Sequence, residues 1–326
     1  MRRVIIIGGT GFLGYHSGLE FLSRGYDVGS LNLPGPGLDE WFPEKITMKT
    51  GNLFEMSHDE LVAAMKGCHA MVYSVGPDDR SMPKTPSYKF FSEKLVDTSV
   101  RVFEAAREAG VKRAVLLNSY FAYFHRIKPK LKLDSRHNYI RARIEQAELV
   151  IGTGKEMMDV MVLELPYIFG TYPGELPIWK EIFLDRLLKF NPVFYPRGGT
   201  SMITVEHVAE AIAGAIEHGK HGKKYHIGDV NMSWHEMFAI MFKAASINRR
   251  VVRLPLWAAK IAGFIMQTNQ RLHGREPGLH LGYIFQDIIS HEFYLDPSQS
   301  VEELKYGRGG VVEAIEETAR ACYGRE

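Results

Sequence analysis

The first 14 residues constrain the fold of this chain most strongly. Four consecutive apolar residues, Val4 to Ile7, are followed at once by a glycine-rich stretch, Gly8 to Gly14. An unbroken apolar run is typical of a central parallel strand that is covered on both faces. The glycines fit the pattern G-x-G-x-x-G, and a helical pattern from Phe12 to about Arg24 follows. This order of strand, glycine turn and helix predicts a Rossmann-type nucleotide site.

The spacing of the glycines suits a dinucleotide. The first allows a tight turn out of the strand, Gly11 lets the backbone approach a pyrophosphate, and Gly14 lets the helix pack closely on the sheet. The free N–H groups at the helix N-terminus then favour the phosphates. An acidic residue at the end of the second strand would favour NAD, but the chain has Asn32 there. Because no Lys or Arg follows before Lys45 to hold a 2′-phosphate, the sequence leaves NAD and NADP both open.

Beyond the glycine turn, apolar runs continue to alternate with helical patterns. We expect further strands at 26–31, 46–48, 70–75, 114–117 and 158–164, and helices at 60–65, 88–109 and 137–152. This alternation predicts an α/β fold with a doubly wound parallel Rossmann-type sheet.

The rhythm changes after Tyr167, where Pro, Trp and Phe are scattered and the strand–helix repeat resumes only partly. We therefore predict a dinucleotide-binding domain in 1–166, to which 201–230 returns. Residues 167–200 and 231–326 are predicted to form mainly a smaller C-terminal substrate lobe.

Composition narrows the setting and the partners. The chain has 40 Lys and Arg against 38 Asp and Glu, so its charge gives no reason to expect nucleic acid. The basic clusters His125 to Lys132 and His218 to Lys224 are interpreted as solvated loops. The two cysteines cannot form a disulfide framework, and no Cys or His spacing resembles a zinc site, so we expect no metal. A cytoplasmic location is the natural inference.

The most hydrophobic later stretch is Leu256 to Met266. It contains Lys260 and falls short of the roughly 20 residues that a membrane span requires. We interpret it as a packed helix and expect no integral membrane span, and peripheral membrane contact is the alternative.

Several blocks of sequence carry a family resemblance. The segments "VIIIGGTGFLGYHSGLEFLSRGYDV", "VFEAAREAGVKRAVLLNSYFAYF", "ELPYIFGTYPG" and "HEFYLDPSQSVEELKYGRGGVVEAIEETA" follow one another along almost the whole chain. In content and order they resemble the extended short-chain dehydrogenase/reductases. That group includes the nucleotide-sugar epimerases and dehydratases, the 3β-hydroxysteroid dehydrogenases and the dihydroflavonol reductases.

The resemblance implies a set of site residues. It implies that NAD or NADP is bound by Gly8, Thr10, Gly11, Phe12, Leu13, Gly14, Asn32, Asn52, Leu53, Ser74, Val75, Gly76, Tyr139, Arg143 and Pro166. It also places catalysis at Ser119, Tyr139 and Arg143. In the family a lysine stands four residues after the tyrosine, and here that position is Arg143.

The chemistry explains the interest of this replacement. A tyrosine exchanges a proton efficiently when a nearby cation lowers its pKa toward the working pH. Positions i and i+4 share one helix face, so Arg143 is expected to lie beside Tyr139 and to lower the pKa of its phenol. Arginine is effectively never deprotonated and cannot relay a proton as lysine can. The alternative is that both residues are structural: Tyr139 is then a packed helix residue, and Arg143 is a surface partner of Glu145 or Glu148.

Other departures from the family pattern are Leu95, Glu164 and His207, which stand where an asparagine, an arginine and an aspartate are common. The histidines His125, His137 and His207 lie near the inferred site without metal-ligand spacing. We interpret them as ordinary loop or surface residues, with His207 or His125 as outside candidates for a substitute proton carrier.

Aromatic residues dominate the predicted substrate side. Tyr120 and Phe121 directly follow Ser119, and Tyr172 and Arg197 are expected to reach the substrate from the lobe. Because this region is more aromatic than polar, it favours an apolar carbonyl or alcohol.

Three hypotheses for the function follow. The first is an NAD(P)-dependent oxidoreductase that moves a hydride between nicotinamide and a ketone or secondary alcohol. The second is a nucleotide-sugar epimerase or dehydratase with tightly bound NAD. The third is a catalytically impaired NAD(P)-binding sensor or partner protein. By analogy with the family, the chain is also expected to form a homodimer.

Overall fold

A seven-stranded parallel sheet forms the centre of the nucleotide half of the molecule. The structure is a computed structural model that describes residues 2–35 and 41–323. For residues 182 and 183 it describes the backbone and not the side chains. The strand order is β10-β6-β5-β4-β1-β2-β3, and every neighbouring pair is parallel. The strands are β1 (Arg3–Ile7), β2 (Asp27–Asn32), β3 (Ile46–Thr50), β4 (Ala70–Tyr73), β5 (Arg113–Ser119), β6 (Asp159–Leu165) and β10 (Lys224–His226). The predicted doubly wound Rossmann-type fold is confirmed.

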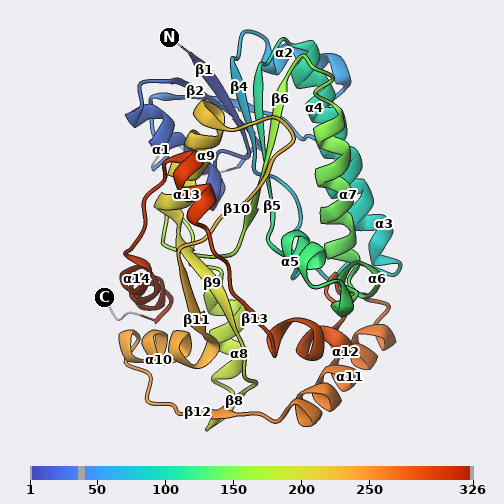
Figure 1. Cartoon of the computed structure of the whole chain (residues 1–326), viewed down its shortest axis with the longest axis vertical. Coiled ribbons are helices and arrows are strands. Elements are labelled where there is room, and N and C mark those ends of the chain that lie inside the picture. The colour runs from blue at the N-terminus through green and yellow to red at the C-terminus, as the bar shows by residue number, and fades with distance from the viewer. Residues whose placement is uncertain (1, 36–40, 324–326) are drawn as a thin grey trace.

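Helices cover both faces of this sheet, as the apolar run in β1 requires. The even-numbered residues Val4 and Ile6 pack in the same core as α1 (Phe12–Ser23) and α9 (Val205–His218). The odd-numbered Ile5 and Ile7 pack in the core on the other face, where α2 (His58–Met65), α4 (Thr98–Glu108) and α7 (Asn138–Gly152) lie. Figure 1 shows α1 and α9 on one side of the strands and α4 and α7 on the other.

The long helix predicted at 88–109 is divided into three segments. It consists of α3 (Ser87–Phe91), a π-helical stretch η2 (Ser92–Asp97) and α4. The side chain of Gln146 on α7 donates a hydrogen bond to the Leu95 carbonyl within the π-helical stretch, at 3.0 Å. A side chain that bonds to a helix carbonyl in this way accompanies a local change of helical pitch.

A second, smaller sheet organises the lobe. β9 (Gly199–Thr204) pairs with β7 (Tyr167–Phe169), β11 (Val230–Ser233) and β13 (Glu292–Phe293). Within 201–230, α9 and β10 therefore return to the nucleotide half, whereas β9 belongs to the second sheet.

Short helices and one strand pair complete the chain. The strand pair is β8 (Val193–Tyr195) with β12 (Val251–Arg253). The remaining helical elements are α5 (Phe121–Ile127), η3 (Pro129–Leu131), α6 (Leu133–Arg136), η4 (Lys180–Leu184), α8 (Asp185–Leu187), α10 (Trp234–Ala244), α11 (Leu256–Leu272), α12 (Leu281–Ile284), η5 (Phe285–Ile289), α13 (Ser298–Leu304) and α14 (Val311–Tyr323).

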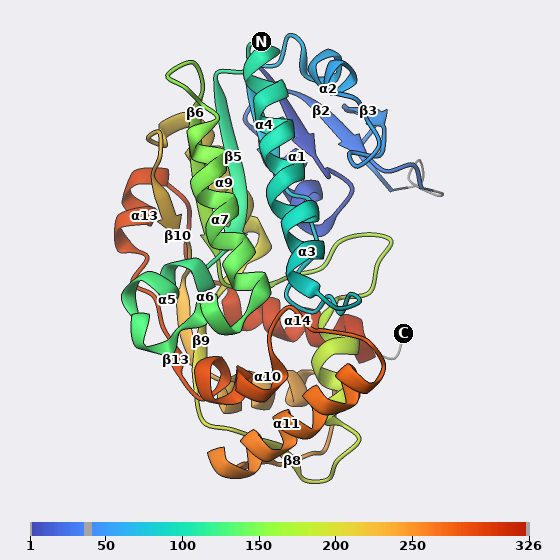
Figure 2. The same ribbon diagram turned by 90° about the vertical axis from the view of Figure 1, so that its right-hand side faces the viewer.

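The lobe lies below the carboxyl ends of the parallel strands. Figures 1 and 2 show the N-terminus at the upper end of the molecule and α10, α11 and β8 at the lower end. In open parallel α/β sheets, ligands bind outside the carboxyl ends of the strands. The fold therefore places a candidate site at the carboxyl ends of the central strands, beside the lobe.

The predicted packing of the hydrophobic stretch after Leu256 is wrong. The helix forms as α11, but only Ala259, Gly263 and Gln267 within it are buried. Its large apolar side chains lie at the surface, because the neighbouring elements cover only a narrow strip of the helix. In the part of the chain that the structure describes, no helix combines the length and the apolar character needed to cross a bilayer.

Candidate active site

The glycine turn after β1 is shaped for close approach. Gly8 has a φ of +87°, a backbone conformation that glycine adopts without strain. A Cβ on Gly14 would lie 2.1 Å from the Gly8 carbonyl oxygen, so only glycine fits where α1 meets the turn. No side chain caps α1 at Gly11, and its first turn holds no acidic residue. Phe12 and Leu13 begin this helix, whose N-terminal N–H groups stay open to an anion.

Asn32 closes this site at the end of β2. Its Oδ1 accepts hydrogen bonds from the Thr10 backbone N–H and from the Ser30 hydroxyl, both at 3.0 Å. Its Nδ2 is buried and has no hydrogen-bond partner among the described residues. A buried donor without a partner is costly, so this amide offers a hydrogen bond to a bound group. These features fit the adenosine and pyrophosphate parts of a dinucleotide.

The other residues predicted to contact the cofactor surround the same turn. The Gly51 N–H donates to the Asn32 carbonyl at 2.8 Å, which places Asn52 and the buried Leu53 beside β2. The Ser74 hydroxyl donates to the Ile7 carbonyl at 2.8 Å.

Val75 and Gly76 follow β4 at the same edge. A Cβ on Gly8 would lie 2.6 Å from a Val75 methyl group, and one on Gly76 would lie 2.5 Å from the Leu95 side chain. A side chain at either glycine would therefore clash where the segment after β4 packs on the glycine turn and on Leu95. Pro166 lies half-buried between β6 and β7.

Three side chains meet at the carboxyl end of β5. Ser119 ends this strand, and Tyr139 lies in the first turn of α7, 5% exposed. Arg143, one turn further, points its Nε at the Tyr139 hydroxyl oxygen over 3.0 Å. The Ser119 side chain lies close enough to this hydroxyl to lower its pKa. The structure thus brings together the three residues that the resemblance indicated for catalysis.

Buried hydrogen bonds fix α7 relative to the sheet. The Asn118 amide donates to the Arg143 carbonyl at 2.9 Å and accepts from the Ser119 N–H at 2.6 Å. Arg143 donates in turn to the Gln146 side chain at 2.9 Å and to the Leu117 carbonyl at 3.3 Å. These contacts hold Tyr139 and Ser119 at a defined separation.

The alternative that Arg143 is a surface partner of Glu145 or Glu148 is wrong. Arg143 is 9% exposed. The Glu145 carboxylate instead accepts from Arg141 at 3.0 Å, and Glu148 pairs with Lys224. The helix turns Arg143 inward because it lies on the same face as Tyr139.

The pKa of Tyr139 is raised above its ordinary value, contrary to the expectation from the sequence. Burial of the phenol is the largest cause. The charge and the hydrogen bond of the Arg143 guanidinium lower this pKa, as expected, and so does the Ser119 side chain, whereas the Asp79 carboxylate raises it. Desolvation of the phenolate outweighs the cation, and the neutral phenol is therefore favoured.

Asp79 is the residue that the sequence analysis missed. Burial raises the pKa of its carboxyl to about 6, while a bond to its own backbone N–H and the charge of Arg143 act to lower it. The loop that carries Asp79 follows β4 and is held by a segment of the lobe, since the Gly278 N–H donates to the Ser81 carbonyl at 3.3 Å. Its position after a parallel strand was the available signal.

The predicted substrate residues do not all face Ser119. Tyr120 and Phe121 are buried in the core, and the Tyr120 hydroxyl hydrogen-bonds to the Thr200 hydroxyl at 2.7 Å. Tyr172 lies beside the glycine turn, with its ring 5.7 Å from that of Phe12.

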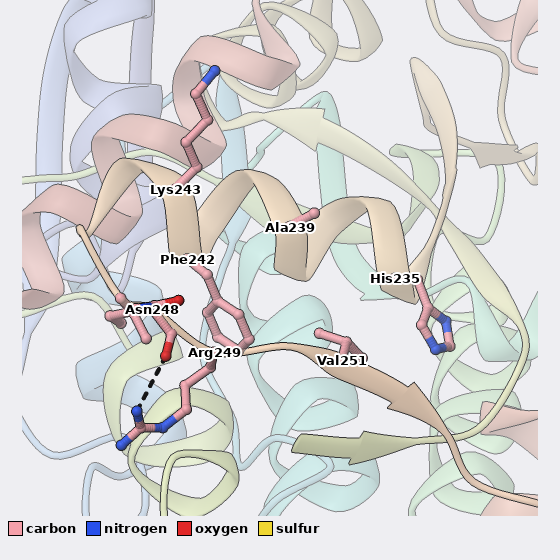
Figure 3. Close-up of a pocket in the computed structure, with 8 residues that line it drawn as sticks. His235, Ala239, Phe242, Lys243, Asn248, Arg249 and Val251 are labelled. Atoms are coloured by element: carbon pink, nitrogen blue, oxygen red, sulfur yellow. Dashed lines mark hydrogen bonds between the residues drawn. The ribbon is translucent and has the colours of Figure 1, made fainter. Parts of the chain in front are cut away.

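Arg197 is exposed in the lobe, and its charge acts on His235. His235 lines a pocket with Phe242, Lys243 and Arg249, at α10 (Figure 3). Among the described residues, no contact links Arg197 or this pocket to Ser119.

The histidines differ in their surroundings. His137 is completely buried, so the interpretation as a loop or surface residue is wrong for it. Its Nδ1 accepts from the His280 N–H at 3.0 Å, and its Nε2 lies 3.5 Å from an Asp287 carboxylate oxygen. His125 lies 3.6 Å from Asp134. In the described structure, no hydrogen bond joins His125 or His207 to Ser119 or Tyr139.

The carboxylate of Glu164 is compensated within the fold. It is completely buried, and both of its oxygens accept from the Arg126 guanidinium, at 2.7 and 2.6 Å. This bidentate pair accounts for an acidic residue at a position where the family often has arginine.

Sequence comparison now decides the family. The profile of the NAD-dependent epimerase/dehydratase family matches residues 4–228. The chain belongs to this family. The NAD-dependent epimerase/dehydratase family consists of NAD-dependent oxidoreductases, epimerases and dehydratases, and the protein is an enzyme of this kind. The resemblance to extended short-chain dehydrogenase/reductases is confirmed.

Two curated relatives illustrate the range of this family. The chain is 23% identical over 283 residues to the decarboxylating sterol-4-alpha-carboxylate 3-dehydrogenase of Mus musculus. The matched region covers 81% of this chain and 75% of the mouse protein. It is 24% identical over 273 residues to vestitone reductase of Medicago sativa, covering 73% and 80% of the two chains.

Solved structures show the same fold. The crystal structure of gox2253 superposes with a TM-score of 0.79 at 19% identity and covers 100% of this chain and 99% of that one. The Bordetella bronchiseptica enzyme WbmH, solved in complex with NAD⁺, gives a TM-score of 0.70 at 16% identity and covers 98% of both chains.

Proposed function

We propose that this enzyme interconverts a ketone and a secondary alcohol of an apolar small molecule, with NAD as the redox partner. The observation that carries the proposal is the 3.0 Å contact between the Arg143 Nε and the Tyr139 hydroxyl, beside Ser119. A buried phenol held between a cation and a hydroxyl donor is suited to exchange a proton with a substrate oxygen.

The glycine turn and Asn32 support NAD as the cofactor. The turn presents α1 N–H groups to the pyrophosphate, and the free Nδ2 of Asn32 can donate to the adenosine ribose. Between Asn32 and Lys45 the sequence has no Lys or Arg that would hold a 2′-phosphate. When bound, the nicotinamide supplies or accepts the hydride.

The protein's own residues move the proton. In the reducing direction, the neutral Tyr139 donates its proton to the carbonyl oxygen, while the Ser119 hydroxyl donates a hydrogen bond to the same oxygen. Arg143 stabilises the phenolate that results, but it passes on no proton because its guanidinium stays charged. The raised pKa of Tyr139 makes the reduction the easier direction near neutral pH.

Aromatic side chains near Tyr139 support an apolar substrate. The Phe91 ring lies 5.6 Å from the Tyr139 ring. The Asp79 carboxylate that acts on Tyr139 also acts on Tyr167, whose ring lies 5.5 Å from that of Trp179. Among the relatives, the mouse enzyme is named for a sterol substrate and the Medicago sativa enzyme for vestitone. A ring-containing ketone is therefore the first class of substrate to screen.

The test is turnover by wild type and by the Tyr139→Phe variant. In a screen of cyclic ketones with NADH, wild type should oxidise NADH, and Tyr139→Phe should lower kcat by at least about 100-fold. NADH affinity should stay close to that of wild type, because only the hydroxyl is removed and the aromatic ring remains. Equal turnover by the two proteins would end the assignment of Tyr139.

One observation favours a nucleotide-sugar epimerase or dehydratase as a second candidate. Arg80 lies close enough to Tyr139 for their charges to interact, and burial lowers the pKa of Arg80 to about 10. This half-buried cation pairs with the Asp78 carboxylate and could exchange that partner for a diphosphate. This candidate predicts tightly bound NAD after purification, binding of a UDP-sugar and no net change in NADH.

A catalytically impaired binding protein is the third candidate, favoured by arginine at the lysine position of the family. It predicts nucleotide binding without turnover of any ketone or sugar, and no activity gained by Arg143→Lys.

A further inference from the structure

The outer face of α11 is apolar and exposed. Trp257, Ile261 and Ile265 are 69%, 54% and 65% exposed. These three, together with Phe264, recur at the i, i+4, i+7 and i+8 positions that share one face of a helix. They line one shallow hollow with the stem of Lys260. We call Trp257, Ile261, Phe264 and Ile265 the apolar face of α11.

The described residues leave this face uncovered because α11 packs through its small residues. A Cβ on Gly263 would lie 2.4 Å from the Leu281 carbonyl oxygen, so the helix is in close backbone contact with α12. The Gln267 side chain accepts a hydrogen bond from the Leu281 N–H at 2.9 Å. With this narrow strip of Ala259, Gly263 and Gln267 turned inward, the large apolar residues of α11 point outward.

Positive charge surrounds the same region of the chain. From 237 to 275 the sequence contains no Asp or Glu, although the whole chain is nearly neutral. The same stretch holds the basic residues Lys243, Arg249, Arg250, Arg253, Lys260, Arg271 and Arg275. All of these except the half-buried Lys260 are exposed, and none takes part in an ion pair among the described residues.

The cations and the apolar face lie at one end of the molecule. Figure 1 shows α10, β12 and α11 at the end opposite the N-terminus, and Figure 2 shows α10 and α11 at the same end. Lys243 and Arg249 line the pocket beside α10, where the Arg249 guanidinium bonds to the Asn248 carbonyl at 3.1 Å (Figure 3). This end therefore combines exposed Trp, Ile and Phe side chains with uncompensated positive charge.

We propose that this end of the protein binds the surface of an anionic lipid bilayer, with α11 lying in the plane of the interface. Its apolar face inserts among the acyl chains near the headgroups, and the surrounding Lys and Arg side chains contact lipid phosphates. A symmetric contact with a second copy would bring the two basic regions together, which like charge opposes. A bilayer with anionic lipid instead supplies the opposite charge, and Trp257 suits the boundary between water and lipid.

The first test is flotation of the full-length protein with phosphatidylcholine vesicles, with and without phosphatidylglycerol. Wild type should float with the anionic vesicles and bind neutral ones at least several-fold more weakly. The double variant Ile261→Glu/Ile265→Glu should lose at least about tenfold in partitioning, because two apolar side chains no longer insert. Wild type that stays unbound at low salt overturns the proposal.

Matched controls separate insertion from charge. Leu149→Glu/Met157→Glu adds the same charge at side chains that are 54% and 61% exposed elsewhere, and it should float as wild type does. Ile261→Ser/Ile265→Ser keeps the charge of α11 and should still lose binding. All these side chains are exposed, so the melting temperatures should stay close to that of wild type. Equal loss in the Leu149 and Ile261 pairs overturns the proposal.

The second test is the fluorescence of Trp257. Trp179 and Trp234 are buried, whereas Trp257 is the most exposed of the described tryptophans. Anionic vesicles should shift the wild-type emission to shorter wavelength, and Trp257→Phe should abolish this shift. A different outcome would refute membrane binding: wild type binds no vesicles and forms a dimer, whereas the Ile261→Glu/Ile265→Glu variant is a monomer. The apolar face of α11 would then contact a second copy of the chain. Neither assay uses turnover, so the outcome is independent of the proposed function.

Discussion

The Nε of Arg143 lies 3.0 Å from the hydroxyl oxygen of Tyr139, one turn earlier on α7. The same guanidinium donates to the Gln146 side chain and to the Leu117 carbonyl. A planar guanidinium can serve all three acceptors at once, because its five N–H groups form a fixed fork. The arginine thus keeps a cation at the phenol and also joins α7 to β5.

Substitution of Arg143 should change the pH dependence of the reaction. Without the cation in Arg143→Met, the pKa of Tyr139 rises further, and the pH profile of alcohol oxidation should move to higher pH. Arg143→Lys keeps the charge and should stay close to the wild-type profile. Steady-state oxidation rates between pH 7 and 10 measure this, and coinciding profiles of Arg143→Met and wild type would refute the electrostatic role.

The two directions of the reaction should depend differently on pH. The pKa of Tyr139 is raised above the ordinary value near 10, so the proton is present through the neutral range. Ketone reduction needs that proton and should be nearly constant from about pH 6 to 9. Alcohol oxidation needs the phenolate and should rise by about tenfold per pH unit in the same range. A reduction rate that falls steeply near pH 7 would contradict this assignment.

Removal of the Asp79 charge should ease oxidation. The Asp79 carboxylate raises the pKa of Tyr139, and its own pKa is about 6, so at pH 8 it is ionised. Asp79→Asn should therefore lower the pKa of Tyr139 and speed oxidation at pH 8 by roughly threefold or more. Below pH 6 wild-type Asp79 is protonated, and the two proteins should converge. Asp59→Asn, which removes an exposed carboxylate on α2, is the control, and an equal effect there would contradict a specific role of the Asp79 charge.

The choice of cofactor should depend on residue 32. In Asn32→Asp the acceptor for the Thr10 N–H and the Ser30 hydroxyl is kept, and a negative charge is added. This charge repels a 2′-phosphate, so NADPH affinity should fall by about tenfold or more while NADH affinity is kept or improved. Titration with both nucleotides measures the ratio. A variant that binds both as wild type does would place the adenosine ribose away from residue 32.

The features that local backbone geometry controls could be predicted from local sequence patterns. The strand at Val4 to Ile7 and the glycine turn were predicted because their spacing reflects the backbone directly. The contact between Tyr139 and Arg143 follows from helical periodicity once α7 is placed.

Features that depend on distant parts of the chain were not predictable in this way. The pKa of Tyr139 rises through burial under residues from other elements. Asp79 acts on Tyr139 from a loop that the lobe contacts through the hydrogen bond from Gly278 to Ser81. β9 leaves the central sheet to pair with strands of the lobe. The exposure of Trp257 depends on which neighbours α11 has, and helical periodicity cannot reveal this.

Calorimetric titration of the purified protein with NADH and with NADPH is the decisive test of the nucleotide site, after copurified nucleotide has been removed and its absence checked by absorbance. We expect saturable binding of NADH, tighter than that of NADPH. A folded protein that binds neither nucleotide would contradict it, because the roles proposed for Ser119, Tyr139 and Arg143 all require nicotinamide at the carboxyl end of β5.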